Sequence, residues 1–180
     1  MSATPRTSDL EHVRFMRLAL AEARKSVYIP SAFCVGAVIV SSAAHPTSPS
    51  EPIATGYSRE LPGNTHAEQC ALDKLPAAKV GSGSTSTAPE NATADDLLEG
   101  ASIYTTMEPC SQRLSGNVPC VQRILATGIK RVFMGVEEPK DFVECEGTRL
   151  LREAGREVYV VVDPTDPELG ETCLKVARGE

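Results

Sequence analysis

The chain has 180 residues, a formal net charge of −6 at pH 7, and 41% hydrophobic residues. A chain of this length can bury a core without disulfides, so we expect one domain over residues 1–180. The acidic balance disfavours a surface that neutralises nucleic-acid phosphates, and no apolar run is long enough for a signal peptide or a membrane span. We therefore expect a cytoplasmic protein that binds neither nucleic acid nor membranes.

The N-terminal half predicts a helix, a pair of strands and a second helix. Ser8 and Glu11 have the spacing of a capping box, and apolar residues then recur at helical spacing to about residue 25. The run FCVGAVIV, residues 33–40, is apolar at every second position in both registers, which predicts a strand covered on both sides in a three-layer fold. A short strand over about 52–57 would complete a hairpin, and a helix is expected from about residue 65 to 75.

The C-terminal half alternates predicted strands and helices. The stretch GSGSTSTAPENATAD has the composition of a linker, and we expect a flexible insertion at about 79–95. The strand SIYTTM follows, Pro119 begins a helix that Gly128 ends, and KRVFMGV is the next strand. The helix EGTRLLREAG and the strand REVYVVV continue the alternation that a parallel sheet requires.

The segment THAE, residues 65–68, has two interpretations. Thr65 and Glu68 have the T-x-x-E spacing of a capping box, which needs no chemistry. The same turn could instead direct His66 and Glu68 into one cavity from a helix N-terminus. His12 and His45 have no partners at ligand spacing, and we expect both on the surface.

The six cysteines also have two interpretations, because free Cys is among the most buried residue types. Cys34, Cys70, Cys145 and Cys173 fit that structural role. Cys110 and Cys120 differ, since each follows a proline and the pair flanks the polar turn SQRLSGNV. That turn could fold outward and return Cys120 to the side of Cys110, so a metal site is the alternative for this pair.

The motifs HAE, TTMEPC and the later PC resemble the zinc-dependent cytidine deaminase superfamily, whose signature is H-x-E with P-C-x-x-C. The long spacer in MEPCSQRLSGNVPC resembles the deaminases of riboflavin biosynthesis, and SAFCVGAVIV with GYSRELPGNTHAEQCAL is most similar to their fungal branch. The likeness covers nearly the whole chain. It implies a three-layer α/β/α sandwich with a mixed five-stranded sheet.

The resemblance also implies a site and a reaction. Zinc would be held by His66, Cys110 and Cys120, with Glu68 as the catalytic proton shuttle and no redox cofactor. The implied substrate is 2,5-diamino-6-ribitylamino-4(3H)-pyrimidinone 5'-phosphate or its ribosylamino form, which would lose its exocyclic amine as ammonia. Bacterial relatives carry different residues at Ala32-Phe33 and at Glu138-Pro139-Lys140, so substrate recognition should differ in detail. We also expect a homodimer.

Four polar residues are candidates for substrate contact because they lie on loops beside a proposed ligand or a strand end: Asn64, Arg113, Glu138 and Lys140. The alternative for each is a solvated loop residue. Two other functions compete with the riboflavin-pathway reaction. One is deamination of another small base or nucleoside of the cytosine or cytidine type, and the other is a non-catalytic zinc-binding module.

Overall fold

The structure, a computed structural model, describes residues 3–42, 51–75, 93–137 and 146–180. These residues contain a six-stranded mixed sheet in the order β1-β6-β5-β4-β2-β3. Strands β4, β5, β6 and β1 run parallel, and β2 is antiparallel to both β3 and β4. The strands are β1 (Arg6–Thr7), β2 (Gly36–Val40), β3 (Ala54–Tyr57), β4 (Ser102–Met107), β5 (Arg131–Val136) and β6 (Glu157–Val161).

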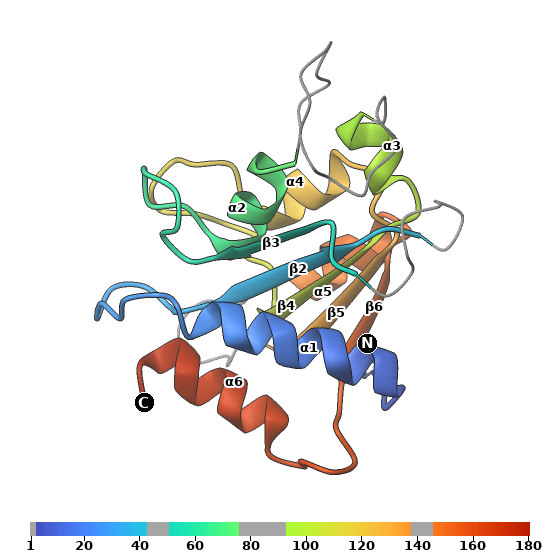
Figure 1. Cartoon of the computed structure of the whole chain (residues 1–180). Helices are drawn as coiled ribbons and strands as arrows, with labels where there is room; N and C mark the ends of the chain where they lie inside the picture. The colour runs from blue at the N-terminus through green and yellow to red at the C-terminus, as the bar shows by residue number, and fades with distance from the viewer. Residues whose placement is uncertain (1–2, 43–50, 76–92, 138–145) are drawn as a thin grey trace.

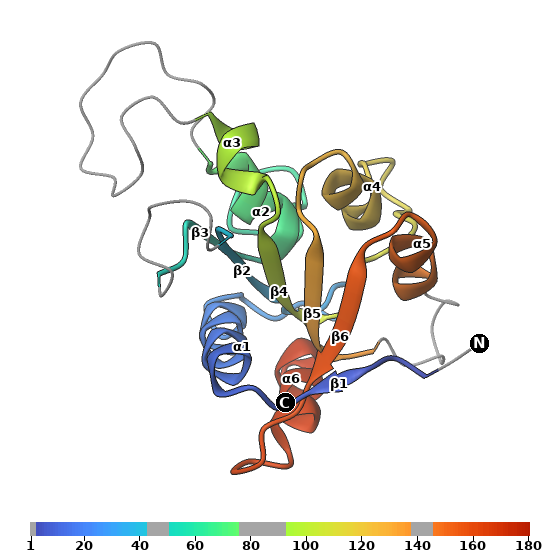
Figure 2. The ribbon, with the colours of Figure 1, turned by 90° about the vertical axis from the view of Figure 1, so that its right-hand side faces the viewer.

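Helices cover both faces of the sheet, which confirms the three-layer α/β/α prediction. Helices α1 and α6 lie on one face, and α2, α4 and α5 lie on the other (Figures 1 and 2). The helices are α1 (Leu10–Ala23), α2 (Ala67–Asp73), α3 (Ala94–Leu98), α4 (Cys120–Leu125), α5 (Gly147–Glu153) and α6 (Leu169–Arg178). None of the described helices is long and apolar enough to cross a membrane.

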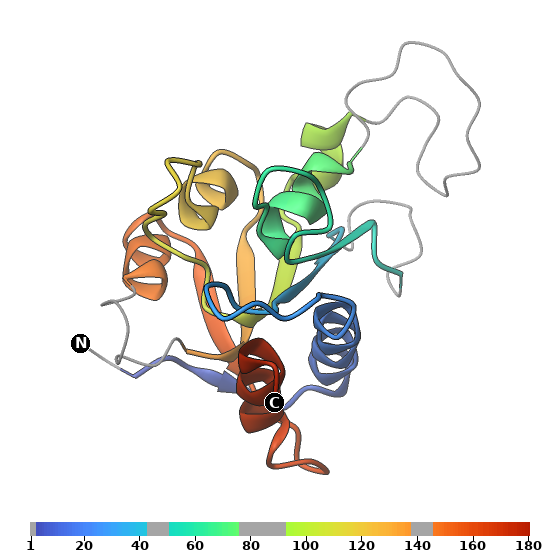
Figure 3. The same ribbon diagram turned by 90° about the vertical axis from the view of Figure 1, so that its left-hand side faces the viewer.

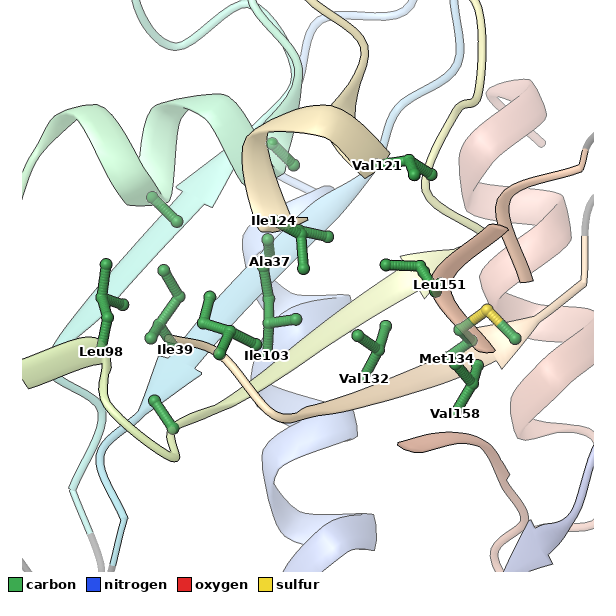
Figure 4. Close-up of a cluster of buried hydrophobic side chains, with 14 of the residues drawn as sticks. Ala37, Ile39, Leu98, Ile103, Val121, Ile124, Val132, Met134, Leu151 and Val158 are labelled. Carbon is green, nitrogen blue, oxygen red and sulfur yellow. The ribbon is translucent and has the colours of Figure 1, made fainter. Parts of the chain in front are cut away.

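The core consists of two clusters, one on each face of the sheet. The sequence of β2 is apolar throughout because successive side chains of a strand point to opposite faces, and both faces of this sheet are covered. Ala37 and Ile39 pack toward α2 and α4, and Figure 4 shows them beside buried residues of the neighbouring strands. Val38 and Val40 belong to the second cluster, with α1 and α6. The first cluster includes residues of α2 and α4, the helices whose starts carry the candidate site.

The boundaries of several predicted elements differ in the structure. The expected strand over residues 33–40 begins only at Gly36, because the preceding residues turn away and line a cavity. The capping box predicted at Ser8 is wrong. Asp9 is the N-cap of α1, and its carboxylate accepts a hydrogen bond of 2.9 Å from the Glu11 amide. The sixth strand, against five expected, is the two-residue β1 at the sheet edge.

Two helices were not predicted from the sequence. Helix α6 follows the last predicted strand and places buried Leu169, Cys173 and Ala177 at helical spacing, a pattern that could have revealed it. Helix α3 begins inside the expected insertion, and Thr93 forms a capping box with Asp96. Most of the insertion, residues 79–92, lies outside the described residues.

The prediction that His12 is an ordinary surface residue is wrong. Its ring lies 4.1 Å from the Phe133 ring, centroid to centroid, and its Nδ1 lies 2.9 Å from the Tyr104 hydroxyl. Burial lowers the pKa of His12 despite the nearby Asp9 carboxylate. His12 is therefore a partly buried member of the α1 face, and His45 lies outside the described residues.

Two glycines allow helices to pack closely against the sheet, and they provide a matched pair of variants. A Cβ on Gly56 would lie 2.3 Å from the Ala67 carbonyl oxygen, and one on Gly36 would lie 2.0 Å from that of Ala19. We expect Gly56→Ala and Gly36→Ala each to lower the free energy of unfolding by at least about 1–3 kcal/mol. Denaturant unfolding would measure this loss.

Only Gly56→Ala should also weaken metal retention in the folded protein, because it displaces α2, the helix that follows His66. Gly36→Ala displaces α1 on the opposite face and is the control. Equal metal retention in the two variants, measured by competition with a chelator, would contradict this expectation.

Candidate active site and metal centre

Three potential metal ligands converge from separate elements on one face of the sheet. His66 is the N-cap of α2, Cys110 lies beyond the C-terminal end of β4, and Cys120 is the first residue of α4. Helices α2 and α4 lie side by side with their N-termini on the same side of the molecule (Figure 3). Parallel packing of these two helices brings together residues more than 40 positions apart in the sequence.

The donor atoms have the spacing of a tetrahedral zinc site. The Nδ1 atom of His66 lies 3.5 Å from the Sγ atoms of both Cys110 and Cys120. Zinc bonds of about 2.3 Å to sulfur and about 2.0–2.1 Å to nitrogen, at a tetrahedral angle, require a sulfur–nitrogen separation of about 3.6 Å. Among the described residues, this is the group of His, Cys and acidic side chains whose ligand atoms could hold a metal ion, all within 4.8 Å of one another.

The thiol chemistry also fits a cation. A hydrogen bond from Cys120 lowers the pKa of Cys110, and the same contact, together with burial, raises the pKa of Cys120. Two thiolates this close repel each other, so both ionise only if a cation lies between them. The residues present therefore fit zinc, which binds cysteine as the thiolate.

Glu68 lies beside the three ligands and is buried, with a relative exposure of 3%. The Cys120 Sγ donates to Glu68 Oε2 over 3.3 Å. Burial raises the pKa of the Glu68 carboxyl, and the negative charge of Cys110 raises it further. A carboxyl group in this environment can hold and release a proton next to the metal position.

The capping-box interpretation of Thr65 and Glu68 is wrong. The N-cap of α2 is His66, and no side chain makes a cap hydrogen bond there. The Thr65 hydroxyl instead donates to the Leu61 carbonyl over 2.7 Å and accepts from the Cys70 thiol over 3.1 Å. Glu68 is thus not required to start the helix, which leaves its buried carboxylate for another role.

A cavity of about 310 Å³ opens beside His66, Glu68 and Cys110. Two of the residues predicted to contact substrate, Asn64 and Arg113, line it. The other two, Glu138 and Lys140, lie outside the described residues and stay predictions. Of the sequence-predicted site residues that the structure describes, all except the buried Cys120 line this cavity.

The polar spacer between the two cysteines is fixed to the segment that carries His66. Arg113 donates to the Gln69 side chain over 3.0 Å and also to the Asn64 carbonyl oxygen. Asn117 donates to the Gly63 carbonyl over 3.2 Å. The Cys110 carbonyl accepts from the Val121 amide over 3.2 Å, which closes the turn. These contacts explain how a nine-residue spacer can return Cys120 to Cys110.

The sequence analysis connected Ala32 and Phe33 with substrate recognition, and both line the cavity. It did not identify Ser58 and Arg59, which line the same cavity from the loop after β3. Arg59 has a positive φ of 63°, which is uncommon for a residue other than glycine. No local pattern marks Arg59, and the only available signal was its place in the segment GYSRELPGNTHAEQC.

A larger hollow of about 960 Å³ lies at the C-terminal ends of β5 and β6. Its described lining contains no His or Cys, and its charged groups include Arg149, which pairs with Glu146 and Glu153. Glu108 borders both hollows, and its carboxylate accepts from the Thr148 amide over 2.7 Å. The smaller cavity is the better candidate because the metal ligands and the buried carboxylate meet there.

Three protein ligands beside a buried acid in an open cavity define a class of site, the catalytic zinc centre of a hydrolase. Residues 10–136 match the family model described as the cytidine and deoxycytidylate deaminase zinc-binding region. The chain belongs to this family, whose metal is zinc. The resemblance seen in the sequence is thereby confirmed.

Comparison with individual relatives shows which members of the family this chain is similar to. The chain is 46% identical over 166 residues to the diaminohydroxyphosphoribosylamino-pyrimidine deaminase of Schizosaccharomyces pombe, and the match covers 92% of this chain and 35% of that protein. It therefore spans about a third of that relative's length. The Aspergillus oryzae Rib2 deaminase in complex with DARIPP matches with a TM-score of 0.65 and 32% identity, covering 94% of this chain and 91% of that chain.

A bacterial structure has the same fold. The diaminohydroxyphosphoribosylaminopyrimidine deaminase/5-amino-6-(5-phosphoribosylamino)uracil reductase of Thermotoga maritima is 26% identical, with a TM-score of 0.65. The match covers 93% of this chain and 39% of that protein. This chain therefore corresponds to a part of the bacterial enzyme.

Proposed function

We propose that the protein is a zinc-dependent deaminase of 2,5-diamino-6-ribitylamino-4(3H)-pyrimidinone 5'-phosphate, or of its ribosylamino form, in riboflavin biosynthesis. The observation that carries the chemistry is the cluster of His66, Cys110 and Cys120 with the Glu68 carboxylate 3.3 Å from one thiol. The likeness to the S. pombe deaminase and to the Rib2 complex supports the substrate.

In this proposal His66, Cys110 and Cys120 hold the metal and Glu68 moves protons. Bound zinc lowers the pKa of a coordinated water to about 7 and so supplies a hydroxide nucleophile at neutral pH. Glu68 takes the proton of the water on its carboxylate and delivers it to the ring nitrogen next to the attacked carbon. The water oxygen bonds to that carbon, and Glu68 passes the remaining hydroxyl proton to the amine. The C–N bond then breaks, the amine leaves as ammonia, and the carbon keeps the oxygen as a carbonyl group.

The substrate contacts in this proposal come from the cavity rim. Asn64 and Arg113 line the cavity, and an arginine matches the charge and geometry of a phosphate ester. Glu138 and Lys140 are proposed as further contacts from the sequence alone. The cavity volume of about 310 Å³ is at the small end of the range for ligand sites, which suits one substituted pyrimidine ring.

We also propose that the protein is a homodimer in the cytoplasm. Exposed apolar side chains on two loops beside the cavity support an interface there: Val27, Tyr28, Leu114 and Val118. The five cysteines among the described residues are free, as is usual in a reducing compartment. Sedimentation of the purified protein would test the dimer.

An ammonia-release assay with three substrates tests the proposed reaction. We expect the ribitylamino or the ribosylamino pyrimidine phosphate to be turned over at least about 100-fold faster than cytidine, because a site that bonds the substrate's polar groups strongly rejects a ligand lacking them. Treatment with a zinc chelator should abolish turnover, and added zinc should restore it. Turnover of cytidine alone would favour a nucleoside deaminase.

A zinc-loaded protein without activity on any of the three substrates would favour the non-catalytic module instead. If the protein unfolds when zinc is removed, the loss of turnover would reflect unfolding and would not show that zinc takes part in catalysis. Circular dichroism of the zinc-free protein is therefore the necessary control.

A further inference from the structure

The side chain of Arg59 joins the loop after β3 to the cavity wall formed by residues 31–33. Its guanidinium donates to the carbonyl oxygens of Phe33 over 3.2 Å and of Val27 over 2.5 Å. The nitrogen that donates to Val27 also lies 3.5 Å from the Cys34 sulfur. One side chain therefore holds both ends of the segment 27–34, which includes the cavity-lining residues 31–33.

The backbone of Arg59 is tied to the metal-binding turn. Its amide donates to the Thr65 carbonyl over 2.7 Å, and Thr65 directly precedes His66. Its φ of 63° lies in the left-handed region, which costs an arginine about 1 kcal/mol or more. Such a conformation persists only where the surroundings hold it, and the two carbonyl contacts supply that restraint.

The neighbouring residue fixes the next part of the same wall. The Ser58 hydroxyl accepts from the Val35 amide over 2.9 Å, and the Ser58 amide donates to the Val35 carbonyl, also over 2.9 Å. Val35 is thus held through Ser58, and the Cys34 amide donates to the Ala177 carbonyl over 2.9 Å. The carbonyl oxygens of Val27 and Phe33 are held by Arg59. Loss of the guanidinium should loosen residues 27–34 without releasing β2.

We propose that Arg59 is a positioning residue that fixes the wall formed by residues 31–33 at a set distance from the metal-binding turn. The wall then holds the substrate ring in register with Glu68, and it limits which substituents fit. This inference rests on the proposed deaminase function. Arg59 acts through the wall and the turn, and its guanidinium is occupied by protein carbonyl groups.

Two substitutions distinguish the contacts that the Arg59 guanidinium makes to two carbonyl groups from the effect of its positive charge. Arg59→Asn removes the guanidinium and keeps a residue type that tolerates the left-handed conformation. Arg59→Lys keeps the charge, but a single ammonium lacks the planar fork that reaches two carbonyls together. Arg156→Asn is the matched control, since Arg156 also donates to two backbone carbonyls, those of Leu125 and Thr127, at the opposite end of the sheet.

We expect both Arg59 variants to raise the KM for the pyrimidine phosphate roughly tenfold, which corresponds to the loss of one charge-assisted hydrogen bond. Their kcat should stay within about threefold of wild type, and zinc content should be unchanged, because the ligands and Glu68 remain in place. Amide hydrogen exchange over residues 27–34 should become roughly tenfold faster. Arg156→Asn should lower thermal stability without changing KM or exchange in that segment.

Several results would overturn the proposal. A wild-type KM in Arg59→Lys would show that charge alone suffices, and zinc loss in either variant would place the effect on the metal site. A raised KM in Arg156→Asn would show that general destabilisation is responsible. If the wild-type protein deaminates no pyrimidine phosphate, the proposed function fails, and exchange over residues 27–34 alone decides whether Arg59 holds the wall.

Discussion

Glu68→Gln is expected to keep its zinc and lose deamination by about 10²- to 10⁴-fold, the usual contribution of a general acid–base group. The amide has nearly the shape of the carboxyl but cannot carry a proton between water, ring nitrogen and leaving amine. Steady-state ammonia release and elemental analysis of the same preparation would measure both quantities.

The structure also predicts that this variant folds normally. Glu68 makes no cap bond for α2, and replacement of a buried acid by a neutral amide removes a desolvation cost. Glu157→Gln is a suitable control, because it makes the same change in a partly exposed residue that pairs with Lys130 at the far end of the sheet. Near-normal turnover by Glu68→Gln would show that the carboxyl has no part in proton transfer.

Cys110→Ser and Cys120→Ser are expected to reduce zinc from about one ion per chain to near zero, with complete loss of activity. A serine hydroxyl stays protonated near neutral pH, so each variant removes one thiolate from a set of three ligands. The thermal midpoint should fall as well, because metal bound to the native state stabilises it.

Cys173→Ser provides the control for these two variants. Cys173 is fully buried against the other face of the sheet, and burial raises its pKa to about 12, so it remains a thiol. The hydroxyl should cost stability in that apolar site while zinc content stays at about one per chain. Full zinc content in Cys110→Ser, or loss of zinc in Cys34→Ser, would show that the ligand assignment is wrong.

The metal ligands and the catalytic carboxylate could be predicted from the sequence because each short motif contains the residue types that the chemistry needs. His66 and Glu68 are two positions apart, and the two Pro-Cys pairs each mark a helix start or a strand end. The central strand was readable for a similar reason. Its residues alternate between two apolar faces, and burial on both faces leaves a continuous apolar run.

Local sequence patterns could not predict the helix caps where the same residue spacing fitted two interpretations. The T-x-x-E spacing of Thr65 and Glu68 fits a capping box, yet the Thr65 hydroxyl bonds to Leu61 and Cys70 instead. The spacing of Ser8 and Glu11 also fits a capping box, but Asp9 is the residue that caps the helix. Each choice depends on where the preceding loop enters the helix, which the packing of that loop sets.

Residue types and their spacing were enough to predict which residues bind zinc and move protons, and that a sheet covered on both faces carries them. Only tertiary packing brings Cys120 to within 3.5 Å of His66, His12 onto the Phe133 ring, and the Arg59 guanidinium to the Phe33 carbonyl. These contacts join residues 26 to 121 positions apart. Such distances are fixed by the stacking of helices on the sheet, which no short sequence pattern records.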